Sequence, residues 1–168
     1  MSPLLETRLE IDLSAFRYNF KVIKKHLKPQ TQIMGVVKAF AYGSDSVVMA
    51  KTLEDLGVSY LAVAYIEEGV RLRKAGMSCP ILIFYPQLEK LPHLLEYKLT
   101  PSVYSFHFLK SLHQYLKSKD IHNFPIHLKI NTGMNRLGFD APDFKGLTNT
   151  LDDGKTFKLR GIFSHLAA

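Results

Sequence analysis

The sequence predicts an α/β protein whose parallel strands alternate with helices as part of a TIM-like (β/α)8 barrel. Short apolar runs alternate with segments of helical periodicity along almost all of the 168 residues. This alternation is typical of parallel sheets with right-handed crossovers. No glycine-rich GxGxxG turn follows the first apolar run, which weakens the alternative, an open doubly wound sheet that binds a dinucleotide. The barrel is therefore the favoured fold class.

The first predicted element is a strand, because apolar Leu9, Ile11 and Leu13 alternate with charged residues. Helical spacing of apolar residues begins after Ser14, which can serve as N-cap. Pro29 ends this predicted helix.

Six further strands are predicted from residue 33 onward, joined by helices. The strands are 33–37, 60–64, 81–84, 100–103, 125–130 and 159–163. The helices are 47–56, 66–75, 89–97, 106–116 and 144–151. A complete barrel needs eight strands and about 250 residues. We therefore expect residues 1–168 to form a single, incomplete barrel domain that is a piece of a longer protein.

The composition is ordinary for a soluble globular domain, with 46% apolar and 22% charged residues. Cys79 is the only cysteine, which excludes an intrachain disulfide and a cysteine metal cluster and favours a reducing compartment. No apolar run reaches the length of a membrane span, and the N-terminus lacks a signal-peptide pattern. We expect a cytoplasmic protein with no metal and no membrane partner.

The formal net charge of +7 raises the question of nucleic-acid binding. The lysines are spread along the polar sides of two predicted helices, and no RNA-binding or zinc-finger signature accompanies them. We therefore expect no nucleic-acid partner, whereas a small anionic ligand would suit a basic chain.

Lys38 ends an apolar run that predicts a buried strand. Burial disfavours the ammonium form, so such a lysine can keep the neutral amine that Schiff-base chemistry needs. The alternative is a lysine that extends its charge into water. In a barrel, Arg136 and His165 would also follow strand ends and meet Lys38 at one mouth. Taken singly, either could be an ordinary loop or packed residue.

Four segments, in order, resemble the N-terminal barrel domain of the alanine racemases, which are pyridoxal-phosphate enzymes of fold type III. Residues 36–43, VVKAFAYG, are similar to the family's cofactor-lysine motif, VVKANAYG. Residues 127–139, HLKINTGMNRLGF, resemble its HLKxDTGMxRLGF stretch. Residues 9–13 resemble its opening strand, and residues 163–167, FSHLA, its FSHxA ending.

The resemblance implies a role for each matching residue. Lys38 would hold pyridoxal 5'-phosphate as an aldimine and act as one of two acid/base groups. Tyr42 would line the cofactor pocket, with its hydroxyl toward the phosphate. Arg136 would reach the cofactor's phenolic oxygen and the substrate carboxylate, and His165 would pack against the pyridine ring. Lys129 stands where some members carry a carbamylated lysine, although an ordinary strand lysine is an equal interpretation.

The implied activity is the interconversion of L-alanine and D-alanine for peptidoglycan synthesis. In the family the second base is a tyrosine from the C-terminal β-domain of the neighbouring subunit in a homodimer. The chain ends before that domain and lacks the later barrel loops that hold the phosphate. We therefore expect the isolated polypeptide to be inactive and to bind the cofactor poorly. A non-catalytic pyridoxal-phosphate barrel and a broad-specificity amino-acid racemase remain the alternatives.

Two departures from the family's pattern occur. Asn131 replaces the usual aspartate, and Ser44 and Asp45 replace the common His-Gly pair. The variants at Phe40 and Ser44 resemble racemase domains fused behind a cell-wall ligase. Neither departure removes a proposed catalytic group.

Overall fold

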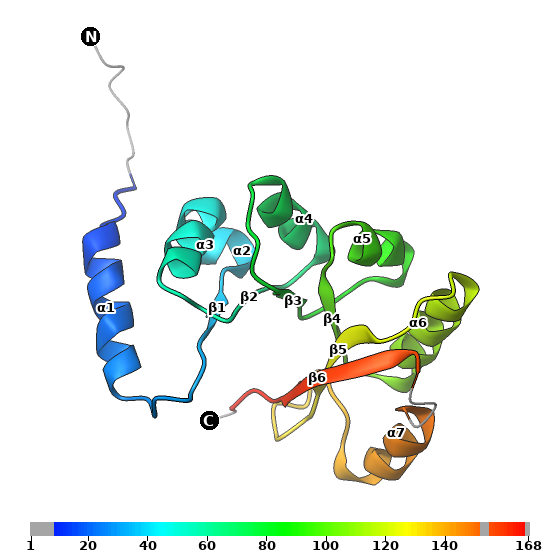
Figure 1. Ribbon diagram of the computed structural model, residues 1–168. Coiled ribbons are helices and arrows are strands. Elements are labelled where there is room, and N and C mark those ends of the chain that lie inside the picture. Colours follow the sequence, from blue (N-terminus) through cyan, green and yellow to red (C-terminus); the bar gives the residue numbers. More distant parts are fainter. Residues whose placement is uncertain (1–8, 152–154, 167–168) are drawn as a thin grey trace.

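The computed structural model describes residues 9–151 and 155–166, which form a six-stranded parallel sheet with helices between the strands (Figure 1). The strands pair in chain order, each with the next. They are β1 (Met34–Val36), β2 (Tyr60–Val63), β3 (Ile81–Ile83), β4 (Thr100–Val103), β5 (Phe124–Lys129) and β6 (Phe157–Phe163).

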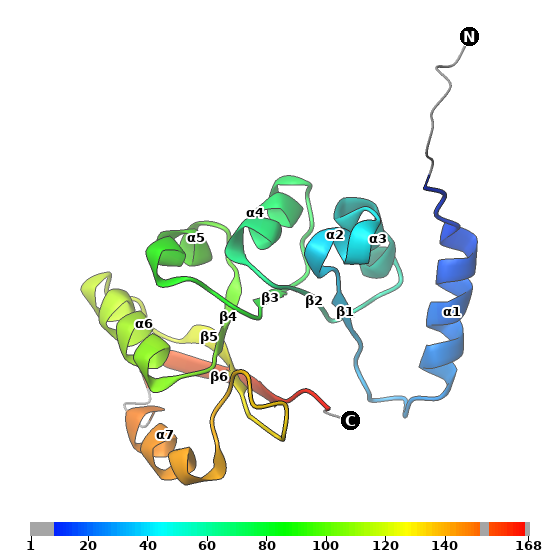
Figure 2. The ribbon, with the colours of Figure 1, turned by 180° about the vertical axis from the view of Figure 1, so that it is seen from behind.

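The helices from α3 onward follow one another along the convex side of the curved sheet (Figures 1 and 2). The α-helices are α1 (Leu13–Lys25), α2 (Lys38–Gly43), α3 (Ser46–Asp55), α4 (Ile66–Lys74), α5 (Leu91–Glu96), α6 (Phe106–Ser118) and α7 (Phe144–Leu151). Short 3-10 turns, η1 (Leu88–Lys90) and η2 (Ala141–Asp143), precede α5 and α7. Strands in chain order with a helix between neighbours form the repeating unit of a (β/α) barrel, so the predicted fold class is confirmed.

The hydrophobic core lies between the sheet and its helices. Leu61, Val63, Ile81 and Ile83 belong to it, because alternate residues of a strand face the same side. The helices approach the strands closely. A Cβ added at Gly69 of α4 would lie 2.8 Å from the Ile83 Cδ1 atom.

The strand predicted before α1 is not formed in the part of it that the structure describes. Residues 9–12 have no regular structure, and α1 begins at Leu13. Asp12, rather than Ser14, is the N-cap, since its carboxylate accepts the N–H groups of Ser14 and Ala15 at 2.8 and 3.0 Å. Leu9 is 68% exposed, and among residues 9–151 and 155–166 no strand pairs with this segment to cover its apolar side chains. Arg8 lies outside the described residues.

Arg73 and Glu54 form hydrogen bonds to the backbone of the loop that precedes β3. The Arg73 guanidinium donates to the carbonyl oxygens of Met77 and Cys79, both at 2.7 Å. The Glu54 carboxylate accepts the backbone N–H groups of Ser78 and Cys79 at 2.8 and 2.7 Å. Burial, assisted by the charge of Glu54, raises the pKa of the Cys79 thiol to about 11. The thiol therefore stays protonated at neutral pH, which indicates a structural residue.

No helix among residues 9–151 and 155–166 combines the length and the apolar character needed to cross a membrane. The same residues contain no cluster of three or more histidine, cysteine, aspartate or glutamate side chains suited to a metal ion.

His127 is a buried titratable residue in β5. Its side chain is 7% exposed, and its ring centroid lies 5.2 Å from that of Tyr60 and 6.4 Å from that of Phe163. The Nε2 atom has no hydrogen-bond partner within the described part of the chain. Burial, with a contribution from the charge of Arg160, lowers the pKa of His127. The folded protein therefore favours the neutral imidazole.

This burial predicts a loss of stability in mild acid. As the pH falls through about 6.5, the unfolded chain protonates its histidine while the folded state resists. The free energy of unfolding should decrease as the pH falls from about 6.5 to the lowered pKa of His127 in the folded state. Below that pKa the contribution of His127 no longer changes with pH. Urea unfolding at several pH values should show that the free energy of unfolding of the His127→Gln variant depends less steeply on pH than that of the wild type. The exposed His107→Gln variant is the control, and equal slopes for wild type and His127→Gln would contradict the prediction.

Candidate active site at the carboxyl edge of the sheet

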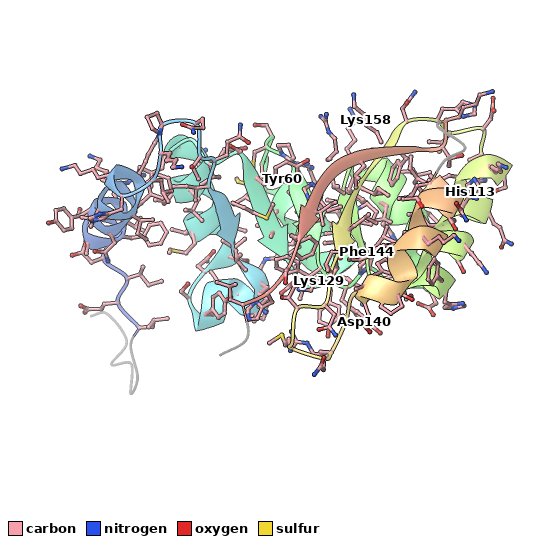
Figure 3. All side chains as sticks on the ribbon, turned by 90° about the horizontal axis from the view of Figure 1, so that it is seen from below. Tyr60, His113, Lys129, Asp140, Phe144 and Lys158 are labelled. Atoms are coloured by element: carbon pink, nitrogen blue, oxygen red, sulfur yellow. The ribbon has the colours of Figure 1, made fainter. Side chains whose placement is uncertain are left out.

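The residues predicted for the site share one edge of the sheet. Figure 3 shows Tyr60 and Lys158, from the beginnings of β2 and β6, on the side opposite Lys129 and Asp140, which lie at and beyond the end of β5. Lys38 follows β1, and His165 follows β6. The carboxyl ends of parallel barrel strands are where active sites form.

Contacts join some of these residues but not all of them. The Lys38 Nζ atom lies 6.0 Å from the centre of the Tyr42 ring. The positive charge of Arg136 contributes, after burial, to lowering the pKa of Lys129. Within the described residues, no hydrogen bond or ion pair links Lys38 to Arg136 or His165. The structure thus confirms the shared edge, while the individual roles stay predictions.

Lys38 is half-buried rather than enclosed, contrary to the expectation of a desolvated strand residue. The reason is that β1 ends at Val36, two residues earlier. The Val37 N–H still donates to the Ala62 carbonyl at 2.9 Å, which extends the pairing of β1 with β2. Lys38 is therefore the first residue to leave the sheet at its carboxyl edge.

A left-handed turn follows Lys38. The φ angles of Ala39, Phe40, Ala41 and Tyr42 lie between +50° and +60°, so α2 has the opposite hand to an ordinary helix. This conformation costs about 1–2 kcal/mol per residue for side chains with a Cβ. Ser44 closes the turn by donating its N–H to the Phe40 carbonyl at 2.8 Å. The turn keeps the Tyr42 side chain, which is 69% exposed, beside Lys38.

Glu68 of α4 is a candidate site residue that the sequence analysis did not identify. One carboxylate oxygen accepts the Ala39 N–H at 2.6 Å. The other accepts the N–H groups of Ala64 and Tyr65 at 2.7 and 3.0 Å. A glutamate at the third position of a helix is a recognisable capping signal. That signal could have located its bond to Tyr65, but not the bond to Ala39.

Lys129 lies at the carboxyl edge of the sheet beside Phe163. It ends β5 half-buried, and its Nζ atom lies 5.2 Å from the centre of the Phe163 ring. Burial, followed by the charge of Arg136, lowers the pKa of Lys129. A lowered pKa increases the fraction of neutral, nucleophilic amine.

The loop that carries Arg136 is organised by Asn131. Its side-chain N–H groups donate to the Asn135 and Asp140 side chains at 2.9 and 2.8 Å. Its side-chain oxygen accepts the N–H groups of Gly133 and Asn135. The Thr132 hydroxyl is hydrogen-bonded to the Ser164 hydroxyl and donates to the His165 carbonyl at 3.2 Å. These contacts connect the Arg136 loop to the segment after β6, although the Arg136 and His165 side chains are exposed.

The Asn131→Asp substitution should destabilise this loop, although aspartate is usual at this position in the proteins that the sequence resembles. Aspartate would remove both N–H donors and face the Asp140 carboxylate. We expect a loss of about 1 kcal/mol at neutral pH, to be measured by urea unfolding. Because charge repulsion is part of the cause, the double variant Asn131→Asp/Asp140→Asn should recover most of the stability. Equal destabilisation of the single and double variants would contradict this explanation.

The arrangement suits covalent capture of an aldehyde that also carries a negative charge. A primary amine forms a Schiff base with a carbonyl group. Arginine supplies paired donors for a phosphate or carboxylate. The fold and the site together define a parallel (β/α)-barrel segment with an amine at the carboxyl end of its first strand.

Comparison with known proteins identifies the family. The family model described as "Alanine racemase, N-terminal domain" matches residues 11–168. The alanine racemase of Treponema denticola is 39% identical over 162 residues, which are 96% of this chain and 42% of that protein. The chain therefore belongs to the alanine racemase N-terminal domain family, and it spans less than half the length of this relative.

Solved structures agree with this assignment. The alanine racemase of Enterococcus faecalis superposes with a TM-score of 0.89 at 32% identity, over 99% of this chain and 46% of that chain. The alanine racemase of Bacillus anthracis, solved with bound L-Ala-P, gives a TM-score of 0.82 at 29% identity, over 94% of this chain and 41% of that chain. The six-stranded sheet thus corresponds to part of a racemase barrel.

Proposed function

We propose that this chain is the cofactor-binding part of a pyridoxal-phosphate-dependent alanine racemase that interconverts L-alanine and D-alanine for peptidoglycan synthesis. The observation that carries the proposal is the position of Lys38. It lies within a VVKAFAYG segment at the carboxyl end of β1, in a barrel of this family. We expect the full-length protein to be a cytoplasmic homodimer.

The described residues fit pyridoxal 5'-phosphate by their chemistry. Lys38 is half-exposed, which suits a residue that must meet an aldehyde from solvent. The lysine and arginine side chains on the same edge would attract the phosphate group. When bound, the cofactor withdraws electrons from the α-carbon of an amino acid and acidifies its proton.

Each site residue has a proposed task. Lys38 binds the cofactor and moves a proton at its Nζ atom on one face of the substrate. Tyr42 lines the cofactor pocket, and His165 packs against the cofactor ring. Arg136 holds the substrate carboxylate. The chemistry of these side chains supports these assignments, which also follow the family's motifs.

Lys129 is a candidate for carbamylation. Only the neutral amine attacks carbon dioxide, and burial together with the charge of Arg136 lowers the pKa of Lys129. The nitrogen would bond to the carbon of carbon dioxide and release a proton to solvent, so that a carbamate replaces a positive charge near Arg136 with a negative one. It would then orient the guanidinium by a charge-assisted hydrogen bond.

Racemisation needs acid/base groups on opposite faces of the substrate. We assign one of them, Lys38, to this chain and the other to the neighbouring subunit's C-terminal β-domain. We therefore expect the isolated chain to lack racemase activity.

Reduction with borohydride tests the proposal. The chain is mixed with an excess of pyridoxal phosphate, because weak binding is expected of the isolated polypeptide. Its absorbance spectrum is recorded, and the reduced adduct is mapped by mass spectrometry. We expect labelling at Lys38, whereas labelling scattered over exposed lysines would contradict the proposal.

Racemase assays of the full-length gene product separate the alternatives. Cofactor binding without racemisation would indicate a non-catalytic pyridoxal-phosphate barrel. Turnover of several amino acids would indicate a broad-specificity racemase.

A further inference from the structure

We infer that Glu68 is a positioning residue for Lys38, because its carboxylate fixes the peptide group that follows the lysine. This inference rests on the proposed function for the role of the amine. Its geometry comes from the hydrogen bonds of the described residues.

The two oxygens of the Glu68 carboxylate have separate partners. Oε2 accepts the N–H groups of Ala64 and Tyr65, which lie directly before its own helix. Oε1 accepts the Ala39 N–H at 2.6 Å, although the two residues are 29 positions apart in the sequence. A helix cap needs only the first set of bonds. The bond from Oε1 connects α4 to the residue that follows Lys38.

The backbone of Lys38 is consequently held on both sides by the same neighbouring segment. Before the lysine, the Val37 N–H donates to the Ala62 carbonyl at 2.9 Å. After it, the Ala39 N–H donates to Glu68. The peptide group between Val37 and Lys38 is bonded within the turn, because the Val37 carbonyl accepts the Ala41 N–H at 3.1 Å. With the backbone bonded before and after the lysine, its side-chain torsions remain as its main freedom. Bonds to β2 and α4 therefore set the direction in which the Lys38 side chain leaves the sheet.

The position of Ala39 explains why this bond matters. Ala39 begins the left-handed turn, with φ at +50°, and its N–H belongs to the peptide group that joins it to Lys38. The bond to Glu68 therefore fixes the peptide plane from which the turn starts. A hydrogen bond to a carboxylate is stronger than one to a neutral acceptor. Glu68 thus opposes relaxation of the turn at its first residue.

Glu67 provides a matched control. It is adjacent to Glu68 in α4, but its side chain is exposed and forms an ion pair with Lys90. The Glu67→Gln and Glu68→Gln variants lose the same charge from the same helical turn. Glutamine at position 68 has one side-chain oxygen, so it can cap the helix or accept from Ala39, but its amide nitrogen cannot accept the remaining bonds.

The experiment measures the backbone and the amine separately in the 168-residue chain. Amide hydrogen exchange is followed at Ala39, and borohydride-trapped pyridoxal phosphate is quantified at Lys38 relative to exposed lysines. Glu68→Gln should raise exchange at Ala39 about tenfold or more, and lower the Lys38 adduct by a similar factor. Glu67→Gln should change neither. Circular dichroism and thermal unfolding establish whether each variant is folded.

Several outcomes would overturn the inference. Exchange at Ala39 that is equal in Glu68→Gln and Glu67→Gln would show that Glu68 does not hold the turn. Faster exchange with an unchanged Lys38 adduct would reduce Glu68 to a structural cap. If Glu68→Gln fails to fold, Glu68→Asp replaces it. Aspartate keeps the charge but is one methylene too short to reach Ala39 and Tyr65 together, and the same criteria apply.

The wild-type chain distinguishes this inference from the proposed function. Absence of a Lys38 adduct in the wild type would contradict the proposed function. It would also remove Glu68 as a positioning residue for that chemistry, whatever hydrogen exchange shows about the turn. A wild-type adduct that persists undiminished in Glu68→Gln would overturn the inference alone.

Discussion

Replacing Lys38 with alanine should abolish the specific pyridoxal-phosphate adduct while leaving the fold intact. The side chain is half-exposed, and its described contact is with the neighbouring Tyr42 ring, so its loss removes little packing. No other residue type can replace the amine as a Schiff-base partner at this position. The measurement is the absorbance band and the mapped adduct after borohydride reduction, with thermal unfolding to verify the fold.

Lys51→Ala is the matched control for Lys38→Ala. Lys51 is an exposed lysine of α3, so its removal changes the net charge equally without touching the carboxyl edge of the sheet. We expect this variant to bind as the wild type does. An absorbance band in Lys38→Ala as strong as that of the wild type, or loss of the Lys38 adduct in Lys51→Ala, would contradict the assignment of the site.

Replacing Gly138 with alanine should destabilise the Arg136 loop severely. Gly138 has φ at +120°, and an added Cβ would lie 2.7 Å from the Asn131 nitrogen and 2.8 Å from the Ile130 carbonyl carbon. Both neighbours are backbone atoms. Moving them would strain two hydrogen bonds, from Asn131 N–H to the Phe139 carbonyl and from Phe139 N–H to the Lys129 carbonyl. We expect a loss of about 3 kcal/mol, to be measured by urea unfolding.

Gly57→Ala separates the steric cost from the conformational cost. Gly57 also has a positive φ, +81°, but an added Cβ there would meet no atom within 4 Å. We expect this control to lose about 1 kcal/mol, which is the cost of the left-handed conformation alone. Equal losses at the two glycines would show that the backbone around Gly138 yields to the added methyl group.

Local patterns in the sequence were sufficient for most of the fold. The run 100–103 coincides with β4, and the periodic segments 66–75 and 144–151 correspond to α4 and α7. These elements follow from the spacing of apolar residues and from nearby breakers, which are properties of a few consecutive positions. The wrong prediction at residues 9–12 has the complementary reason. An alternating pattern forms a strand only when another strand lies beside it.

The sequence by itself determined the repeating strand and helix order, and with it the placement of Lys38, Arg136 and His165 after strand ends. A parallel sheet then brings those ends to one edge. Only the tertiary structure decided that Ala39 to Tyr42 form a left-handed turn and that Glu68 holds the first residue of that turn. The physical reason is distance along the chain, since the hydrogen bond that stabilises this turn comes from a carboxylate 29 residues away, which no local pattern records.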